Sequence, residues 1–231
     1  MDRVRNLQTW LNSKGAKLTI DGQWGPATRS AVIETFRNTD APAVTPAELK
    51  MYADSLGVTA RQLATVGVVE SAGGGWDDTG LLKCLFERHY AWRRIKVAIP
   101  FLSDPTPGGY TIDADKDGVN DSWEKLADLT GRVGFNIAAE CASFGRFQIM
   151  GAHWKALGYD TVADFIWRLS RTEAAHYDAL CRFVKVNGLA PAMRAISDDP
   201  ADCLAFARGY NGKGQKGYDT RLALAYGRLR G

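Results

Sequence analysis

An apolar segment that ends in a carboxylate and a run of glycines is the feature that most constrains this chain. Residues 63–69 are almost entirely apolar, Glu70 follows them, and glycines occupy positions 73–75. On a helix Leu63, Val66 and Glu70 share one face, because residues three and four positions apart are neighbours. We therefore predict a helix that packs this face inward and is ended by the glycines.

The position of Glu70 predicts a general acid. A carboxylate on the inward face of an apolar helix is partly desolvated, and desolvation raises its pKa. A group that holds its proton near neutral pH can protonate a leaving group. The competing interpretation is a surface glutamate at a fraying helix end.

The composition is that of an ordinary globular protein. The chain has 231 residues, of which 45% are hydrophobic and 24% charged, which is enough apolar material for one or two packed domains. A net charge of +3 is too small to indicate nucleic-acid binding. No apolar run has the length of a signal-peptide core or a membrane-spanning helix. We expect a monomer that folds in a cytoplasm, without a nucleic-acid partner or stable membrane association.

The cysteines predict packing rather than chemistry. They are scattered, and no two of them form a CxxC pair. We expect buried free thiols rather than disulfides or zinc ligands. The four are Cys84, Cys141, Cys181 and Cys203.

The order of helical segments predicts two domains. Residues 1–40 form a small helical unit whose second helix opens at Pro26, and a proline-containing linker follows. Residues 45–231 are mainly helical, with a short strand near residues 82–86. The predicted fold class is therefore mainly α, of the α+β kind, with a small β-sheet in the larger domain. Later helices are expected near 122–132, 161–170, 172–187, 200–209 and 217–229.

The first unit contains a recognisable motif. Leu7-Gln8 is followed by Asp21-Gly22-Gln23-Trp24-Gly25-Pro26-Ala27-Thr28. With these residues the segment 3–38 resembles the small peptidoglycan-binding domain of many cell-wall hydrolases. The resemblance implies that the domain at residues 1–40 binds bacterial peptidoglycan.

Five further segments occur in the order of another family. They are Val69-Glu70-Ser71-Ala72-Gly73, Leu85-Phe86-Glu87-Arg88-His89, Pro107-Gly108-Gly109-Tyr110, Ala142–Gly151 and Ala207–Gly212. Through them residues 66–226 resemble the N-acetylmuramidase domain of phage endolysins, a member of the lysozyme-like superfamily. The resemblance implies a lysozyme-like helical fold with Glu70 as the catalytic acid at the end of a buried helix.

Glu87 is the best candidate for a second catalytic carboxylate. Glycoside hydrolysis usually takes two carboxyl groups, one to protonate the leaving oxygen and one to activate water or attack the sugar. Glu87 stands at the end of the predicted strand, and its competing interpretation is an ion pair with Arg88 or Arg93. Asp77 and Asp78 are rivals for the same role, although both also suit a turn.

The resemblance also implies four substrate-binding residues. In lysozyme-like folds a Ser/Gly-rich turn with a glutamine lines the groove beside the acid, and Ser143 and Gln148 match those positions. A glutamine amide offers both a donor and an acceptor to sugars. Tyr210 and Asn211 precede a glycine-rich turn and are expected to border the groove.

An acidic segment fits the twelve-residue calcium loop. Residues 113–124 have carboxylates at loop positions 1, 3, 5, 9 and 12 and glycine at position 6. The competing interpretation is an acidic turn before a helix near Ser122. Catalysis is expected to need no cofactor, whereas a structural Ca²⁺ is possible. The ligands would be Asp113, Asp115, Asp117, Val119, Asp121 and Glu124.

The predicted function is hydrolysis of the β-1,4 bond between N-acetylmuramic acid and N-acetylglucosamine. Such an endolysin waits in the host cytoplasm until a membrane pore admits it to the periplasm and cell wall. One alternative is a lytic transglycosylase, which needs no second carboxylate and gives 1,6-anhydro products. Another is a non-catalytic wall-binding protein.

Overall fold

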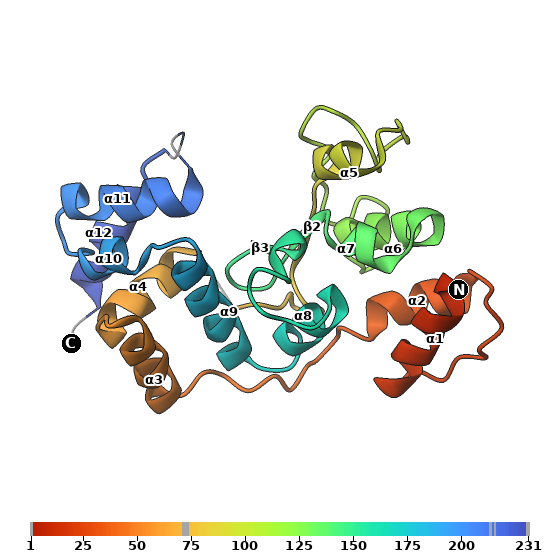
Figure 1. The fold of residues 1–231 in the computed structure, drawn as a ribbon, viewed down its shortest axis with the longest axis horizontal. Coiled ribbons are helices and arrows are strands. Elements are labelled where there is room, and N and C mark those ends of the chain that lie inside the picture. The colour runs from red at the N-terminus through yellow and green to blue at the C-terminus, as the bar shows by residue number, and fades with distance from the viewer. Residues whose placement is uncertain (1, 71–73, 213, 215, 230–231) are drawn as a thin grey trace. The chain divides into compact units, whose positions relative to one another are not determined.

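The computed structural model describes residues 2–70, 74–212, 214 and 216–229 (Figure 1). It divides into two compact units, each built from separate stretches of chain. Unit 1 contains residues 1–40 and 76–170, and unit 2 contains residues 41–75 and 171–231. The fold is mainly helical with one small antiparallel sheet, which confirms the predicted fold class.

Unit 1 combines the N-terminal helix pair with the sheet and the middle helices. The first pair is α1 (Arg3–Ser13) and α2 (Pro26–Glu34), and Pro26 is the first residue of α2 as predicted. The other elements are β1 (Cys84–Phe86), α5 (Arg88–Ile95), α6 (Asp121–Val133), α7 (Phe135–Ala139), β2 (Ala142–Phe144), β3 (Ile149–Met150), a 3-10 turn η1 (Gly151–His153) and α8 (Val162–Leu169).

The three strands form an antiparallel sheet in the order β1-β2-β3. Phe144 faces Cys84 across one pairing and Ile149 across the other. The short connection from β2 to β3 starts at Gly145, whose φ of 70° lies in the left-handed region. The segment predicted as a Ser/Gly-rich turn is therefore a complete small hairpin, and its residues Phe144 and Ile149 are buried.

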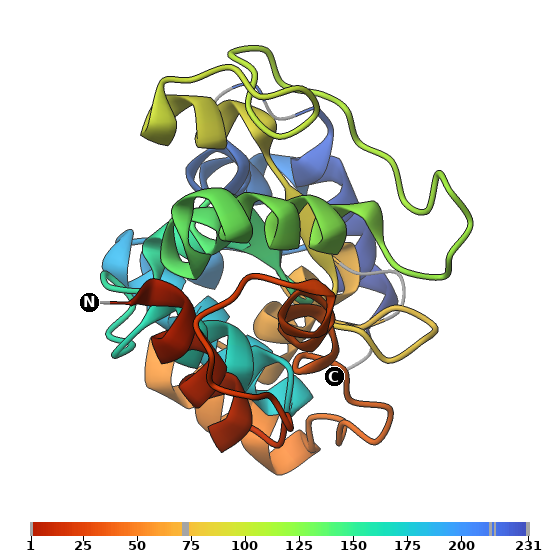
Figure 2. The same ribbon diagram turned by 90° about the vertical axis from the view of Figure 1, so that its right-hand side faces the viewer.

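The N-terminal helix pair packs directly against α6 (Figure 2). Arg29 of α2 lies 2.8 Å from both Glu124 and Asp128 on α6. The ring of Trp24 lies so close to Gly131 that an added Cβ would come within 2.3 Å of Trp24 Nε1. The first forty residues thus share the core of unit 1, although the sequence predicted a separate domain ending there.

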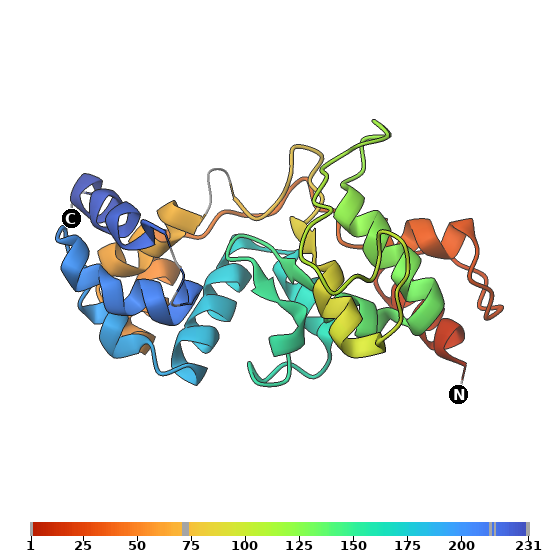
Figure 3. The ribbon, with the colours of Figure 1, turned by 90° about the horizontal axis from the view of Figure 1, so that it is seen from above.

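Unit 2 is a group of helices (Figure 3). It contains α3 (Pro46–Leu56), α4 (Ala60–Glu70), α9 (Glu173–Val186), α10 (Ala190–Arg194), α11 (Pro200–Asn211) and α12 (Tyr218–Arg228). Helix α12 packs against both α4 and α11. Thr45 and Glu48 cap α3 reciprocally, and Thr59 and Gln62 do the same before α4.

Most of the predicted helices are found, and three short ones are new. Helices α5, α7 and α10 were not expected from the sequence. In α5 only Ala91 is buried, so the segment lacks the apolar periodicity that marks a helix. In the part of the chain that the structure describes, no helix is long and apolar enough to span a membrane. All four cysteines are buried free thiols, as predicted.

Candidate active site

Glu70 is the last residue of α4. Leu63 and Val66 on the predicted inward face are fully buried, whereas Val68 on the opposite side is 50% exposed. Glu70 itself is half-buried at the end of this face. Residues 71–73, which include part of the predicted glycine stop, lie outside the described residues. The amphipathic pattern therefore gave the orientation of α4 correctly.

The surroundings of Glu70 favour its protonated form. Burial raises the pKa of Glu70 above its usual value, while the Tyr218 hydroxyl and the Arg221 guanidinium partly oppose this rise. Both of these groups belong to α12, which packs against α4. A raised pKa keeps a larger share of a carboxyl group protonated at a given pH, which is the property that a general acid needs.

Tyr218 is a neighbour of Glu70 that the sequence did not indicate. Its side chain is only 2% exposed, and burial together with the charge of Glu70 raises its pKa well above the usual value. The hydroxyl therefore keeps its proton and can serve only as a neutral hydrogen-bond partner for a carboxylate. The Arg221 guanidinium lies over the Tyr218 ring, 5.5 Å from its centroid. Periodicity would have identified Tyr218 only as an apolar position.

Tyr210 belongs to the same aromatic group, in α11. Its ring stacks on Tyr218 with a centroid distance of 6.1 Å and on Phe206 at 5.4 Å. Burial and the charge of Glu70 raise the pKa of Tyr210. The structure therefore places Tyr210 near Glu70. Asn211 is the exposed last residue of α11.

Glu87 lies in unit 1, at the junction of β1 and α5. It is the N-cap residue of α5, and its side chain is 17% exposed. Its Oε2 accepts a hydrogen bond of 2.7 Å from the Tyr110 hydroxyl. His89 Nδ1 lies 3.1 Å from the same oxygen, a distance suited to an ion pair when the imidazole is protonated, although it lacks hydrogen-bond geometry. Glu87 thus accepts a hydrogen bond from Tyr110 and lies close to His89, and both residues belong to the segments that resemble the N-acetylmuramidase domain.

Arg88 does not pair with Glu87 but holds a loop. Its guanidinium donates to the backbone oxygens of Thr106 and Pro107 at 2.8 and 3.4 Å. Among the described residues neither Arg88 nor Arg93 forms an ion pair with Glu87, and Arg93 lies over the Tyr90 ring instead. The loop held by Arg88 leads to Tyr110. Two motif segments that are distant in sequence therefore meet at Glu87.

The aspartates that rival Glu87 lie in a turn of unit 1. Asp77 Oδ1 accepts hydrogen bonds from the Thr79 and Leu81 amides and from the Thr79 hydroxyl. Asp78 is exposed. The three bonds give Asp77 a structural role in the turn.

Ser143 and Gln148 contact each other in the β2–β3 hairpin. The Ser143 hydroxyl donates to Gln148 Oε1 at 2.8 Å, and Gln148 Nε2 donates to the Gly145 carbonyl at 2.8 Å. Gln148 is half-buried with a φ of 46°, a left-handed conformation that is unusual outside glycine. Ser143 is 4% exposed, so its hydroxyl positions Gln148.

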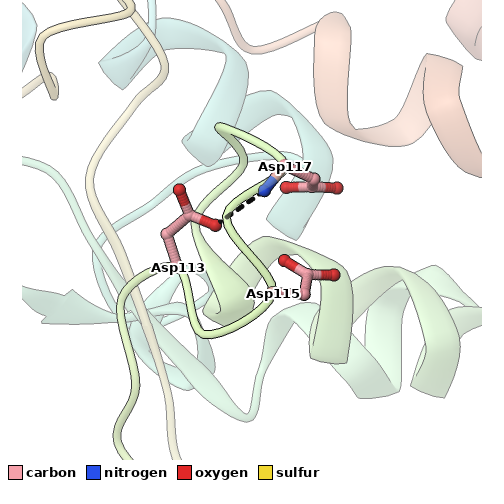
Figure 4. Close-up of side chains that lie close together, drawn as sticks. All are labelled: Asp113, Asp115 and Asp117. Carbon is pink, nitrogen blue, oxygen red and sulfur yellow. Dashed lines mark hydrogen bonds between the residues drawn. The ribbon is translucent and has the colours of Figure 1, made fainter.

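The acidic loop of unit 1 brings three predicted calcium ligands together (Figure 4). Carboxylate oxygens of Asp113, Asp115 and Asp117 lie within 4.8 Å of one another. Asp113 accepts hydrogen bonds from the amides of Asp117 and Gly118 at 3.0 and 3.2 Å, which folds the loop around its first position. Clustered carboxylate oxygens are the ligands that Ca²⁺ prefers.

The remaining predicted ligands have other partners. Asp121 Oδ1 accepts from the Ala114 amide at 3.0 Å, and Glu124 lies 2.8 Å from Arg29. The carboxylates of Asp121 and Glu124 form a second cluster with Asp115, and this cluster does not include Asp113 or Asp117. A cation at positions 1, 3 and 5 would therefore be held by Asp113, Asp115 and Asp117. Glu124 would have to leave its ion pair to join them.

Calcium is expected to raise the midpoint of thermal unfolding relative to an excess of chelator. A cation that binds only the folded state stabilises it by about 2.7 kcal/mol at a concentration of 100 times Kd. Differential scanning fluorimetry measures the shift, and the Asp115→Asn variant should abolish it. Equal midpoints with calcium and chelator in the parent protein would show that the loop is an acidic turn.

Comparison with known proteins identifies a family and a similar solved structure. The family model described as N-acetylmuramidase matches residues 59–230. Among solved structures, the Burkholderia AP3 phage endolysin is similar with a TM-score of 0.70 and 32% sequence identity, over 97% of this chain and 93% of that chain. No curated protein sequence gives a significant match.

Proposed function

Since the chain belongs to the N-acetylmuramidase family, we propose that it cleaves the β-1,4 bond between N-acetylmuramic acid and N-acetylglucosamine and thereby lyses a bacterial host. The coarser assignment, a glycoside hydrolase that acts on peptidoglycan, follows from the family match and the likeness to a phage endolysin. The observation that best supports cleavage of a glycosidic bond by this chain is Glu70, a carboxyl with a raised pKa at the end of a buried helix face, and the N-acetylmuramidase family match favours the choice of bond.

Glu70 is the general acid of this proposal. Its proton passes to the glycosidic oxygen as the bond to the anomeric carbon breaks, which lets the leaving sugar depart as a neutral alcohol. Tyr218 and Arg221 limit the rise in the pKa of Glu70. In the proposal the acid is protonated for the first step and becomes an anion after it.

Glu87 is the second carboxylate of the proposal. It activates water or stabilises positive charge on the sugar. Tyr110, which donates to Glu87 Oε2, fixes the orientation of the carboxylate, and His89 Nδ1 lies 3.1 Å from the same oxygen. Gln148, positioned by Ser143, and Tyr210 and Asn211 supply contacts to the glycan. The helix pair at residues 1–40 contributes wall binding, and the enzyme reaches the wall when the host membrane is breached at lysis.

The products of a murein digest test the proposed reaction. We expect mass spectrometry of purified murein treated with the protein to show free reducing ends at N-acetylmuramic acid. Free ends at N-acetylglucosamine would contradict the bond specificity. Products with 1,6-anhydro ends would identify a lytic transglycosylase, in which a hydroxyl of the sugar replaces water. Murein suspensions whose turbidity does not fall would indicate a wall-binding protein without activity.

The activity of the Glu87→Gln variant distinguishes a hydrolase from a lytic transglycosylase. A hydrolase that uses Glu87 should lose most of its activity, whereas a transglycosylase needs only Glu70. The Asp77→Asn variant is the matched control. Near-normal activity of Glu87→Gln together with a large loss in Asp77→Asn would transfer the role to Asp77.

A further inference from the structure

A pocket in unit 1 contains none of the catalytic, substrate-binding or calcium-binding residues named above. It has a volume of about 410 Å³ and is lined by α1, α7 and the start of α8. Its principal side chains are Asn6, Leu7, Trp10, Phe135, Asn136 and Ile137. The volume falls within the range of about 300 to 1,000 Å³ that is typical of small-molecule sites.

The apolar wall of the pocket is a partly exposed aromatic surface. Trp10 is half-buried, and its ring stacks on the buried Phe135 with a centroid distance of 6.2 Å and an angle of 27°. Trp167 meets Trp10 edge-on at 6.4 Å. These contacts hold the indole in one orientation. Lys14 Nζ also lies over the Trp10 ring, 5.7 Å from its centroid, so a sugar ring that stacks on the accessible part of the indole would displace this flexible side chain.

The polar side chains at the pocket include two amides, beside Thr161 and the Arg3 guanidinium, which donates to the Val133 carbonyl at 2.8 Å. Asn6 and Asn136 are exposed, and within the described ranges neither side chain makes a hydrogen bond to another residue. Each amide offers a carbonyl acceptor and an NH₂ donor. That pair matches the N–H and C=O of an acetamido group. The pocket thus combines a surface for stacking with groups that recognise an amide.

From this combination we propose that the pocket binds an N-acetylglucosamine unit of the wall glycan, at a site separate from the residues that cut it. The inference depends on the proposed function, because peptidoglycan supplies the sugar. It gives the predicted wall-binding role of residues 1–40 a definite place, shared between α1 and the rest of unit 1. A second contact on the same polymer keeps the enzyme on its substrate between cleavages.

NMR spectroscopy with N,N′,N″-triacetylchitotriose tests the site directly. The Glu70→Gln chain is used so that the sugar is not cut, and the Trp10 indole signal is assigned through Trp10→Phe. We expect this signal to shift on titration. The double replacement of Asn6 and Asn136 by alanine should weaken the binding that shifts it about tenfold, since two hydrogen bonds are lost. Thr9→Ala, an exposed change on α1 outside the pocket, should leave the binding unchanged.

Co-sedimentation with purified murein sacculi extends the test to the polymer. The fraction of protein that sediments with the sacculi should be smaller for the double alanine variant than for Thr9→Ala. The inference would be overturned by a Trp10 signal that does not move at saturating sugar, or by equal sedimentation of both variants. Murein cleavage by the parent chain would still support the proposed function in that case. Absence of murein cleavage by the parent chain would count against the proposed function alone, because the titration reads sugar binding without it.

Discussion

Glu70→Gln is expected to leave a folded protein whose lytic rate is lower by a factor of roughly 10² to 10⁴, the usual contribution of a general acid. Glutamine keeps the size and polarity of the side chain but has no proton to give to the glycosidic oxygen. Turbidity loss of purified murein measures the rate. The matched control is Glu34→Gln, which breaks only a surface ion pair with Arg37 and should keep its activity.

The same variant should be more stable than the parent protein at neutral pH. Burial raises the pKa of Glu70 in the folded state, so ionisation destabilises the fold. The protonated carboxyl's contribution is complete below the unfolded value of about 4.3 and is lost as the pH rises through the folded pKa. A glutamine at position 70 does not ionise, so the Glu70→Gln variant does not lose this stability as the pH rises.

Thermal melts at two pH values check this sign. The midpoint of Glu70→Gln minus that of the parent should be larger at pH 7 than at pH 4. In the turbidity assay, a Glu70→Gln variant that clears murein at the parent rate would show that Glu70 is not the general acid. An equal midpoint difference at both pH values would show instead that the carboxyl group is solvated in the folded protein.

Phe36→Ala is expected to lower the free energy of unfolding by about 3 to 5 kcal/mol, as other buried Phe→Ala changes do. Phe36 is fully buried, and its ring stacks on Trp123 at 5.0 Å and on Phe135 at 6.0 Å. The change would empty the junction between the N-terminal helix pair and α6. Urea denaturation followed by circular dichroism measures the loss.

Phe101→Ala is the control for this prediction. Phe101 is 80% exposed, so the same atoms are removed without leaving a cavity, and its effect should be near zero. If Phe36→Ala melts only a small fraction of the structure and leaves the rest unchanged, residues 1–40 form an autonomous domain. A single cooperative loss of unit 1 would show that this segment is part of its core.

Local patterns in the sequence were sufficient for much of the fold. The periodicity of residues 63–70 oriented α4 and put Glu70 on the same face as Leu63 and Val66, because a helix brings residues three and four apart onto one face. Reciprocal caps at Thr45 and Thr59 marked the starts of α3 and α4 for the same local reason. The spacing of the acidic loop likewise predicted the clustering of Asp113, Asp115 and Asp117.

Only the tertiary structure decided which distant residues meet. Tyr218 reaches Glu70, and Tyr110 reaches Glu87, through the packing of separate elements. The Trp24 ring packs against Gly131 of α6, so the N-terminal segment shares a core with residues that the sequence pattern assigned to a separate domain. Periodicity reports which side of a helix is buried but not which surface buries it, since that choice depends on the shape and charge of both partners.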